Sequence, residues 1–111
     1  MQPMIKVFLA DESGVKFFGE GPYQLLKGIE KTGSLRASAS NMHMAYSKAL
    51  KIIKQAEDYL GYKLITRVTG GKDGGGSQIT LEGKKLILKY EQYAQECRKA
   101  SSQIYKEIFG N

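Results

Sequence analysis

The sequence predicts a mostly α-helical fold with a small amount of β-structure: a winged helix-turn-helix with an N-terminal β-hairpin and a long C-terminal dimerisation helix. Three observations favour this fold. Residues 33–61 have the pattern of two helices joined by a tight turn. Strand-like runs at 63–68 and 78–81 enclose the glycine-rich loop 69–77, an arrangement typical of a wing. Apolar residues then recur about every 3.5 residues through a helical stretch at 82–109.

The composition indicates one soluble globular domain. The chain has 111 residues, of which 41% are hydrophobic and 25% charged, as is usual for such a domain. We divide it into a winged helix-turn-helix DNA-binding domain at 1–81 and a C-terminal dimerisation helix at 82–111. No apolar run approaches the roughly 18 residues of a membrane span, and the N-terminus lacks the features of a signal peptide. With Cys97 as the one cysteine, no intrachain disulfide can form, and we expect a cytoplasmic protein.

The N-terminal part predicts a β-hairpin followed by a helix. Residues 4–10 are rich in β-forming side chains, residues 11–14 have turn chemistry, and residues 15–18 can return as the partner strand. Pro22 suits the first turn of a helix that continues over 23–31. We expect this helix to support the next two as a three-helix core.

The stretch 33–61 carries the helix-turn-helix pattern. Ser34 can cap the first helix, because its hydroxyl can accept from the unpaired N–H groups of the next turn. This helix runs to Met42, a turn follows at 41–44, and the second helix begins near Ala45 and ends at Gly61. Apolar residues of the second helix recur at steps of three and four and mark one buried face: Ala49, Ile52, Ile53, Ala56 and Leu60. Taken alone, the stretch fits a plain αα-hairpin equally well.

Positive charge is concentrated in this part of the chain. The net charge is +6 and the isoelectric point is near 9.4, which favours a polyanionic partner. Positions 36 to 72 contain seven basic and two acidic residues, so this segment has a net charge of +5 out of the total of +6. The alternative to a binding surface is a lysine-rich face that is merely solvated. The positive charge coincides with the helix-turn-helix and the wing, which disfavours this alternative.

The C-terminal stretch predicts a dimer. A helix of about 28 residues would be about 42 Å long, too long for so small a domain to cover. We therefore predict a homodimer, with a helix folded back onto its own core as the alternative. We call the apolar stripe of this helix, through which two copies would pair, the seam. Its residues recur at steps of four and three, and they are Leu86, Tyr90, Tyr93, Cys97, Ala100, Ile104 and, one turn further, Ile108.

These motifs together resemble the N-terminal DNA-binding domain of the molybdate-responsive transcription regulators, the ModE family. The resemblance covers roughly residues 6–88, and its most specific part is the run TGGKDGGGSQITLEG, starting at Thr69. LysR-type regulators share the helix-turn-helix and a long helix but usually lack the N-terminal hairpin and this wing, so they are the second choice. The chain ends at Asn111, so the resemblance implies the DNA-binding half alone, with the family's separate molybdate-binding domain absent from this chain.

The resemblance implies that the protein binds operator DNA. Carried over by position, the contacts of the second helix fall on Ala45, Tyr46, Ser47, Lys48 and Lys51. The sequence departs from the family pattern where Ala45 replaces a capping serine, Ser47 a lysine, His43 a turn glycine and Leu50 a tryptophan. We expect His43 to adopt a left-handed conformation, which histidine tolerates better than most residues.

The full DNA-binding prediction adds residues at the first helix and the wing. Lys48 and Ser47 are expected to read bases, and Lys51 to hold phosphate. Arg67 and Lys72 are expected to contact phosphate or the minor groove. Tyr46 has the alternative of packing against Leu35. The predicted contact set is Ser34, Arg36, Ala45, Tyr46, Ser47, Lys48, Lys51, Arg67 and Lys72.

The predicted function is that of a DNA-binding transcriptional regulator. The alternative is a winged-helix protein-interaction or architectural module that does not read sequence, which the changes at Ala45 and Ser47 would suit. We predict no enzyme, because no nucleophile–base pair or carboxylate pair is recognisable. We also predict no cofactor and no metal site: Met42, His43 and Met44 are too close along the chain to converge on a metal, and the glycine-rich loop lacks phosphate-loop order.

Overall fold

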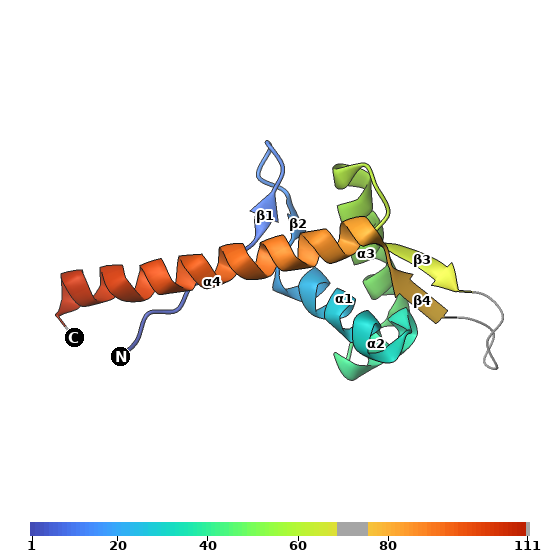
Figure 1. The fold of residues 1–111 in the computed structure, drawn as a ribbon, viewed down its shortest axis with the longest axis horizontal. Helices are drawn as coiled ribbons and strands as arrows, with labels where there is room; N and C mark the ends of the chain where they lie inside the picture. The colour runs from blue at the N-terminus through green and yellow to red at the C-terminus, as the bar shows by residue number, and fades with distance from the viewer. Residues whose placement is uncertain (69–75, 111) are drawn as a thin grey trace.

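A computed structural model describes residues 1–68 and 76–110, and these form the expected mostly α-helical fold with two small antiparallel hairpins (Figure 1). The four helices are α1 (Glu20–Thr32), α2 (Leu35–Asn41), α3 (Tyr46–Leu60) and α4 (Leu81–Phe109). The four strands are β1 (Leu9–Ala10), β2 (Lys16–Phe18), β3 (Ile65–Val68) and β4 (Gly76–Ile79). The winged helix-turn-helix architecture with its long C-terminal helix is confirmed.

The N-terminal hairpin is shorter than predicted, because β1 contains only two residues. The prediction of a strand over 4–10 is wrong at 4–8, where the chain is not part of a strand. We call residues 1–8 the N-terminal arm. The arm bonds to α4 instead of to β2. The hydroxyl of Tyr90 donates to the Val7 carbonyl at 2.7 Å, and that of Tyr105 donates to the Met1 carbonyl at 3.1 Å. The arm therefore lies along the long helix (Figure 1).

Helices α1, α2 and α3 form the expected three-helix core. The Ser34 hydroxyl accepts from the Ala37 N–H at 3.0 Å, which confirms the predicted cap of α2. Helices α1 and α2 approach closely at Gly28, where a Cβ would lie 2.1 Å from the Ser38 hydroxyl oxygen. That hydroxyl is buried and donates to the Leu25 carbonyl at 2.8 Å.

The turn between α2 and α3 has the predicted left-handed residue. His43 has φ 55°, and Gly61 at the end of α3 has φ 80°. Helix α2 ends at Asn41, so Met42 is its C-cap residue rather than part of the helix. Met42 and Met44 pack partly buried against the core. The turn thus fixes where α3 begins.

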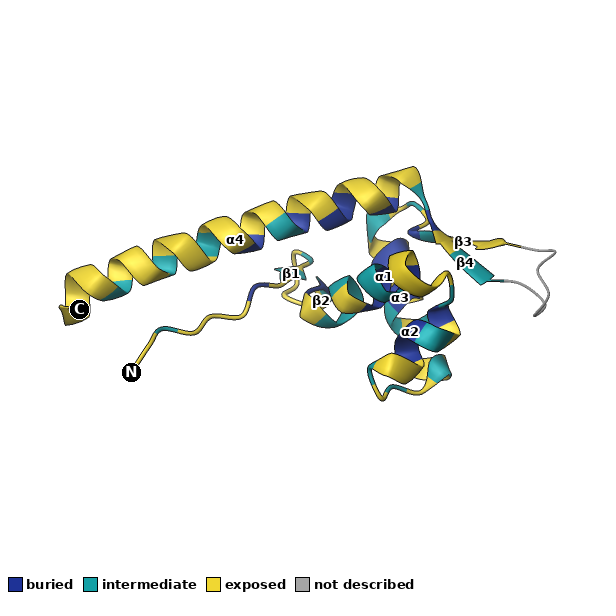
Figure 2. Ribbon diagram, turned by 60° about the horizontal axis from the view of Figure 1, so that its bottom comes forward, coloured by how far each residue is buried: buried dark blue, intermediate teal, exposed yellow. Residues whose placement is uncertain are grey.

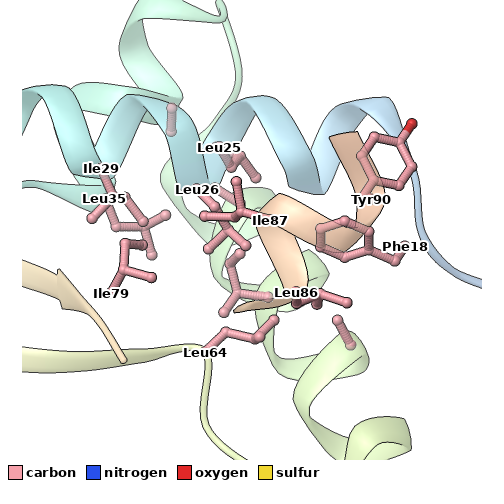
Figure 3. Close-up of a cluster of buried hydrophobic side chains, with 14 of the residues drawn as sticks. Phe18, Leu25, Leu26, Ile29, Leu35, Leu64, Ile79, Leu86, Ile87 and Tyr90 are labelled. Carbon is pink, nitrogen blue, oxygen red and sulfur yellow. The ribbon is translucent and has the colours of Figure 1, made fainter. Parts of the chain in front are cut away.

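One hydrophobic core joins the N-terminal hairpin, the three helices, the wing and the first half of α4. Figure 3 shows Leu25, Leu26 and Ile87 at its centre, with Phe18 and Tyr90 together at one end. The rings of Phe18 and Tyr90 meet edge to face with centroids 5.3 Å apart. Burying such side chains stabilises the fold by roughly 1.5–3 kcal/mol each.

The wing strands are shifted toward the loop relative to the prediction. Strands β3 and β4 pair antiparallel from Ile65 with Ile79 to Val68 with Gly76, so the second strand begins inside the expected loop. Thr80, expected in this strand, instead caps α4 by accepting from the Gly83 N–H at 2.9 Å. The wing is joined to the turn after α1 by a bond from the Ser77 N–H to the Gly33 carbonyl at 2.8 Å.

Helix α4 packs on the core with its first half only. Its buried residues end at Ala94, and the helix then extends away from the domain (Figure 2). Leu86 and Tyr90, predicted to form part of an exposed seam, are 9% and 3% exposed within their own domain. The prediction of one continuous exposed seam is therefore wrong at these two positions, because the core covers them.

Candidate nucleic-acid interface

Helix α3 presents a polar, lysine-rich face to solvent. Ala49, Ile53 and Ala56 are at most 1% exposed, and their burial against the core fixes the rotation of the helix. Ser47, Lys48 and Lys51 are therefore exposed on the opposite side, where residues three and four apart are neighbours. The structure thus brings together the three predicted residues at the centre of the DNA-binding set.

Of the two acidic residues of α3, Asp58 is exposed, whereas Glu57 does not offset the charge of the lysine-rich face. Glu57 is 8% exposed, and its carboxylate accepts from the Leu64 N–H at 2.8 Å and lies 3.7 Å from the Lys63 ammonium. Glu57 therefore points into the connection between α3 and β3. Lys54 was not in the predicted contact set, but it is exposed three residues after Lys51. The same three-residue spacing in the sequence could have identified it.

A contact between α2 and α3 was missed by the sequence analysis. The Arg36 guanidinium lies 4.1 Å from the centroid of the Tyr46 ring, within the range of a cation–π interaction. Tyr46 is also partly buried against the core, which agrees with the alternative of packing. The pair joins the second residue of α2 to the first of α3, and no local pattern in the sequence signals it.

The first turn of α3 lacks a side-chain cap. Ala45 occupies the N-cap position and makes no side-chain hydrogen bond, as expected from the loss of the serine. The N–H groups of such a turn are unpaired donors, and the helix dipole adds a partial positive charge. Ser34 uses its hydroxyl oxygen as the cap of α2 and is partly buried. Its predicted DNA contact would require the same hydroxyl to serve as a donor.

The wing contributes Arg67, which is exposed on β3. The bond between Ser77 and Gly33 holds strand β4 of the wing beside the turn that precedes α2. Lys72 lies outside the described residues. Arg67 and Lys72 as backbone or minor-groove contacts stay predictions.

The predicted dimerisation residues fall into two groups. Leu86 and Tyr90 belong to the core, whereas Tyr93, Ile104 and Ile108 are 55%, 51% and 71% exposed. Cys97 is partly buried between these groups and is a free thiol. Phe109, which was not predicted, is 61% exposed beside Tyr105, with ring centroids 5.0 Å apart.

Over the ranges 1–68 and 76–110, no group of three His, Cys, Asp or Glu side chains is arranged to hold a metal ion. Within those same ranges, no helix combines the length and apolar character needed to cross a membrane.

The fold and the exposed face of α3 define a helix-turn-helix domain, and comparison with known sequences identifies its class. Residues 23–84 match the bacterial regulatory helix-turn-helix proteins of the lysR family, and the chain belongs to that family.

Individual relatives are ModE regulators and related molybdenum proteins. The chain is 37% identical over 76 residues to the DNA-binding transcriptional dual regulator ModE of Escherichia coli K12, covering 68% of this chain and 29% of that protein. It is 28% identical over 85 residues to the molybdenum transport protein ModE of Azotobacter vinelandii, covering 77% and 32%. It is 32% identical over 84 residues to the molybdenum-pterin-binding protein MopB of Rhodobacter capsulatus, covering 76% and 31%.

The chain thus spans about 30% of the length of these relatives. The predicted resemblance to the N-terminal domain of the ModE regulators is confirmed. Among solved structures, ArgP from Mycobacterium tuberculosis has a similar fold, with a TM-score of 0.55 and 22% identity over 77% of this chain and 30% of that one.

Proposed function

We propose that this chain binds double-stranded DNA as a transcriptional regulator, with α3 as the recognition helix in the major groove. The observation that carries the proposal is the exposed face of Ser47, Lys48 and Lys51 on a helix whose rotation is fixed by its buried side. A recognition helix contacts base edges with its N-terminal residues. Three exposed positions in the first two turns of α3 meet that requirement.

The residues of this face have different roles. Lys48 donates to the O6 and N7 acceptors of guanine, and Ser47 bonds to a neighbouring base. Lys51, and Lys54 one turn later, contact phosphate and set the register of the helix on the duplex. Arg36, stacked on Tyr46, joins the first helix of the motif to the start of the recognition helix. Arg67 and Lys72 contact the backbone or minor groove from the wing.

We further propose that the protein acts as a homodimer through the second half of α4. Tyr93, Ile104 and Ile108 form an exposed apolar stripe on α4, whose buried residues end at Ala94. Such a stripe needs a partner surface in water. A second copy supplies an identical stripe, as in a two-fold symmetric dimer.

Fluorescence anisotropy on duplexes selected from random DNA tests the proposal. Lys48→Ala should weaken binding to the selected duplex by about 1–3 kcal/mol and relax preference at one position. Lys51→Ala should weaken binding to selected and random duplexes alike and lower the salt dependence by about one unit. Lys89→Ala, which removes the same charge from an exposed site on α4, is the matched control.

Equal, small losses for Lys48→Ala and Lys51→Ala on both kinds of duplex would contradict base reading by α3. The uncapped Ala45 and the short side chain of Ser47 would then support the architectural or protein-interaction module instead.

A further inference from the structure

A groove of about 590 Å³ lies between the N-terminal part of the chain and α3. The N-terminal arm, β2, the start of α1, the middle of α3 and one residue of α4 line it. Its apolar walls come from Val7, Phe8, Phe17, Phe18 and Ile52. Its volume lies within the range of about 300–1,000 Å³ found for small-molecule sites, which are mostly apolar with a few polar groups.

The charged groups of the groove are mainly basic. Lys6, Lys16 and Arg98 line it together with one carboxylate, Glu20. The Arg98 guanidinium lies 4.0 Å from that carboxylate and forms an exposed ion pair with it. The Lys16 ammonium lies 4.3 Å from the centroid of the Phe8 ring. Among the described residues, neither Lys6 nor Lys16 forms an ion pair, so the groove keeps two uncompensated cations beside an aromatic wall.

Charge decides between two occupants of this groove. The exposed end of a partner's α4 is apolar, but from position 98 to 109 it has three basic residues and one acidic residue. Docking that end would bring like charges together, which disfavours it. A small anion with an apolar body complements both the walls and the two lysines.

We propose that this groove binds a small amphipathic carboxylic acid, free in solution, whose apolar body contacts Phe8, Phe17 and Ile52 and whose carboxylate contacts Lys6 and Lys16. A carboxylate accepting from an ammonium forms a charge-assisted hydrogen bond, which is stronger than a neutral one. The apolar walls provide affinity for the body, and the lysines select for the anion.

The groove also connects the two functional surfaces. Ile52 and Gln55 lie on α3, the former next to Lys51, and Phe17 of β2 stacks on Tyr59 of the same helix with ring centroids 4.1 Å apart. Arg98 lies on the part of α4 that leaves the domain. The bound acid therefore acts as an effector that changes DNA affinity, a step that rests on the proposed function.

Direct ligand binding is measured first, without DNA, on the full chain. The probe is 1-anilinonaphthalene-8-sulfonate, a fluorescent aromatic anion. It should saturate a site in the groove, and the Lys6→Gln/Lys16→Gln double variant should weaken that binding by about tenfold. The control is Lys84→Gln/Lys85→Gln, which removes two exposed lysines outside the groove and should leave the affinity unchanged. Equal weakening by both double variants would overturn the site.

A competition experiment tests the class of ligand. Naphthalene-2-carboxylate should displace the probe at least about tenfold better than 2-naphthalenemethanol, which has the same rings but no charge. In NMR spectra, the acid should shift signals of Phe8 and Ile52 more than those of Ile104 and Ile108. Equal displacement by both compounds, or shifts confined to Ile104 and Ile108, would overturn the proposal.

The effector role is tested by DNA anisotropy with and without saturating naphthalene-2-carboxylate. We expect a change of at least about fivefold in DNA affinity, absent in the Lys6→Gln/Lys16→Gln variant. An unchanged affinity in a wild type that binds both acid and DNA would overturn the effector role. Failure of the wild type to bind DNA at all would contradict the proposed function. The titration with the fluorescent probe contains no DNA, so it tests the ligand site independently of that function.

Discussion

Tyr23 gives a pH-dependent contribution to stability. Its hydroxyl donates to the Glu91 carboxylate, joining α1 to α4, and burial followed by this hydrogen bond raises the pKa of Tyr23 to about 12. The folded state therefore favours the protonated phenol. The resulting stabilisation is fully present below the unfolded pKa of about 10 and is lost as the pH rises from there to about 12.

We predict that Tyr23→Phe makes the free energy of unfolding less dependent on pH between 10 and 12, as measured by urea unfolding. Glu91→Gln should reduce the dependence partly, because the burial of the phenol remains. A Tyr23→Phe protein whose stability falls with pH as steeply as the wild type would show that another group titrates.

The left-handed backbone conformation of His43 gives a prediction about the stability of the turn. His43 holds φ 55°, which disfavours a residue with a Cβ by about 1–2 kcal/mol, whereas glycine adopts it freely but loses more entropy on folding. His43→Gly should therefore raise the free energy of unfolding by about 0.5–1 kcal/mol. Ser40→Gly, an exposed substitution within α2, should lower it by up to about 1 kcal/mol. If His43→Gly destabilises as much as Ser40→Gly, the left-handed conformation is not strained.

Single residues were predictable where their role is local. The Ser34 cap, the Asp11–Gly14 turn and the end of α3 at Gly61 depend on neighbours within a few positions, and all are as predicted. The stacking of Arg36 on Tyr46 depends on how two helices meet, which no local pattern contains. No local pattern signals either that the Glu57 carboxylate is buried and bonded to the backbone.

At the scale of elements, periodicity fixed which face of α3 is buried but not what covers α4. The buried positions of α3 follow the three- and four-residue steps closely. The same steps in α4 suggested one continuous seam, yet Leu86 and Tyr90 lie in the core and Ile104 and Ile108 are exposed. A stripe in the sequence does not say whether its own domain or another chain covers it.

The exposed half of α4 yields a prediction about oligomeric state. Ile104→Asp with Ile108→Asp should convert a homodimer into monomers in sedimentation velocity at tens of micromolar, because two charges would enter the apolar contact. Gln95→Asp with Ser102→Asp adds the same charges at exposed positions on the other side of the helix and should leave the dimer intact. A wild type that is already monomeric at this concentration would refute dimerisation by α4.

At the scale of the whole molecule, element order was predictable and the course of the N-terminal arm was not. The order of hairpin, helix-turn-helix, wing and long helix follows from turn residues and periodicity. The arm reads as a strand from its composition, but its carbonyls accept from Tyr90 and Tyr105, residues 83 and 104 positions away. Such distant partners cannot be inferred from the sequence alone, and the groove beside the arm was missed for the same reason.

The most direct test of the account is affinity cleavage of a selected operator by the protein itself. An iron–EDTA group is attached to Ala45→Cys, at the exposed start of α3, in a Cys97→Ser background. We predict two clusters of cleavage about 10–10.5 base pairs apart, or a multiple of that spacing, as expected for two recognition helices of a dimer on one face of DNA. Uniform cleavage along the duplex, or the same pattern from a probe at Gln92→Cys on α4, would contradict DNA reading by α3.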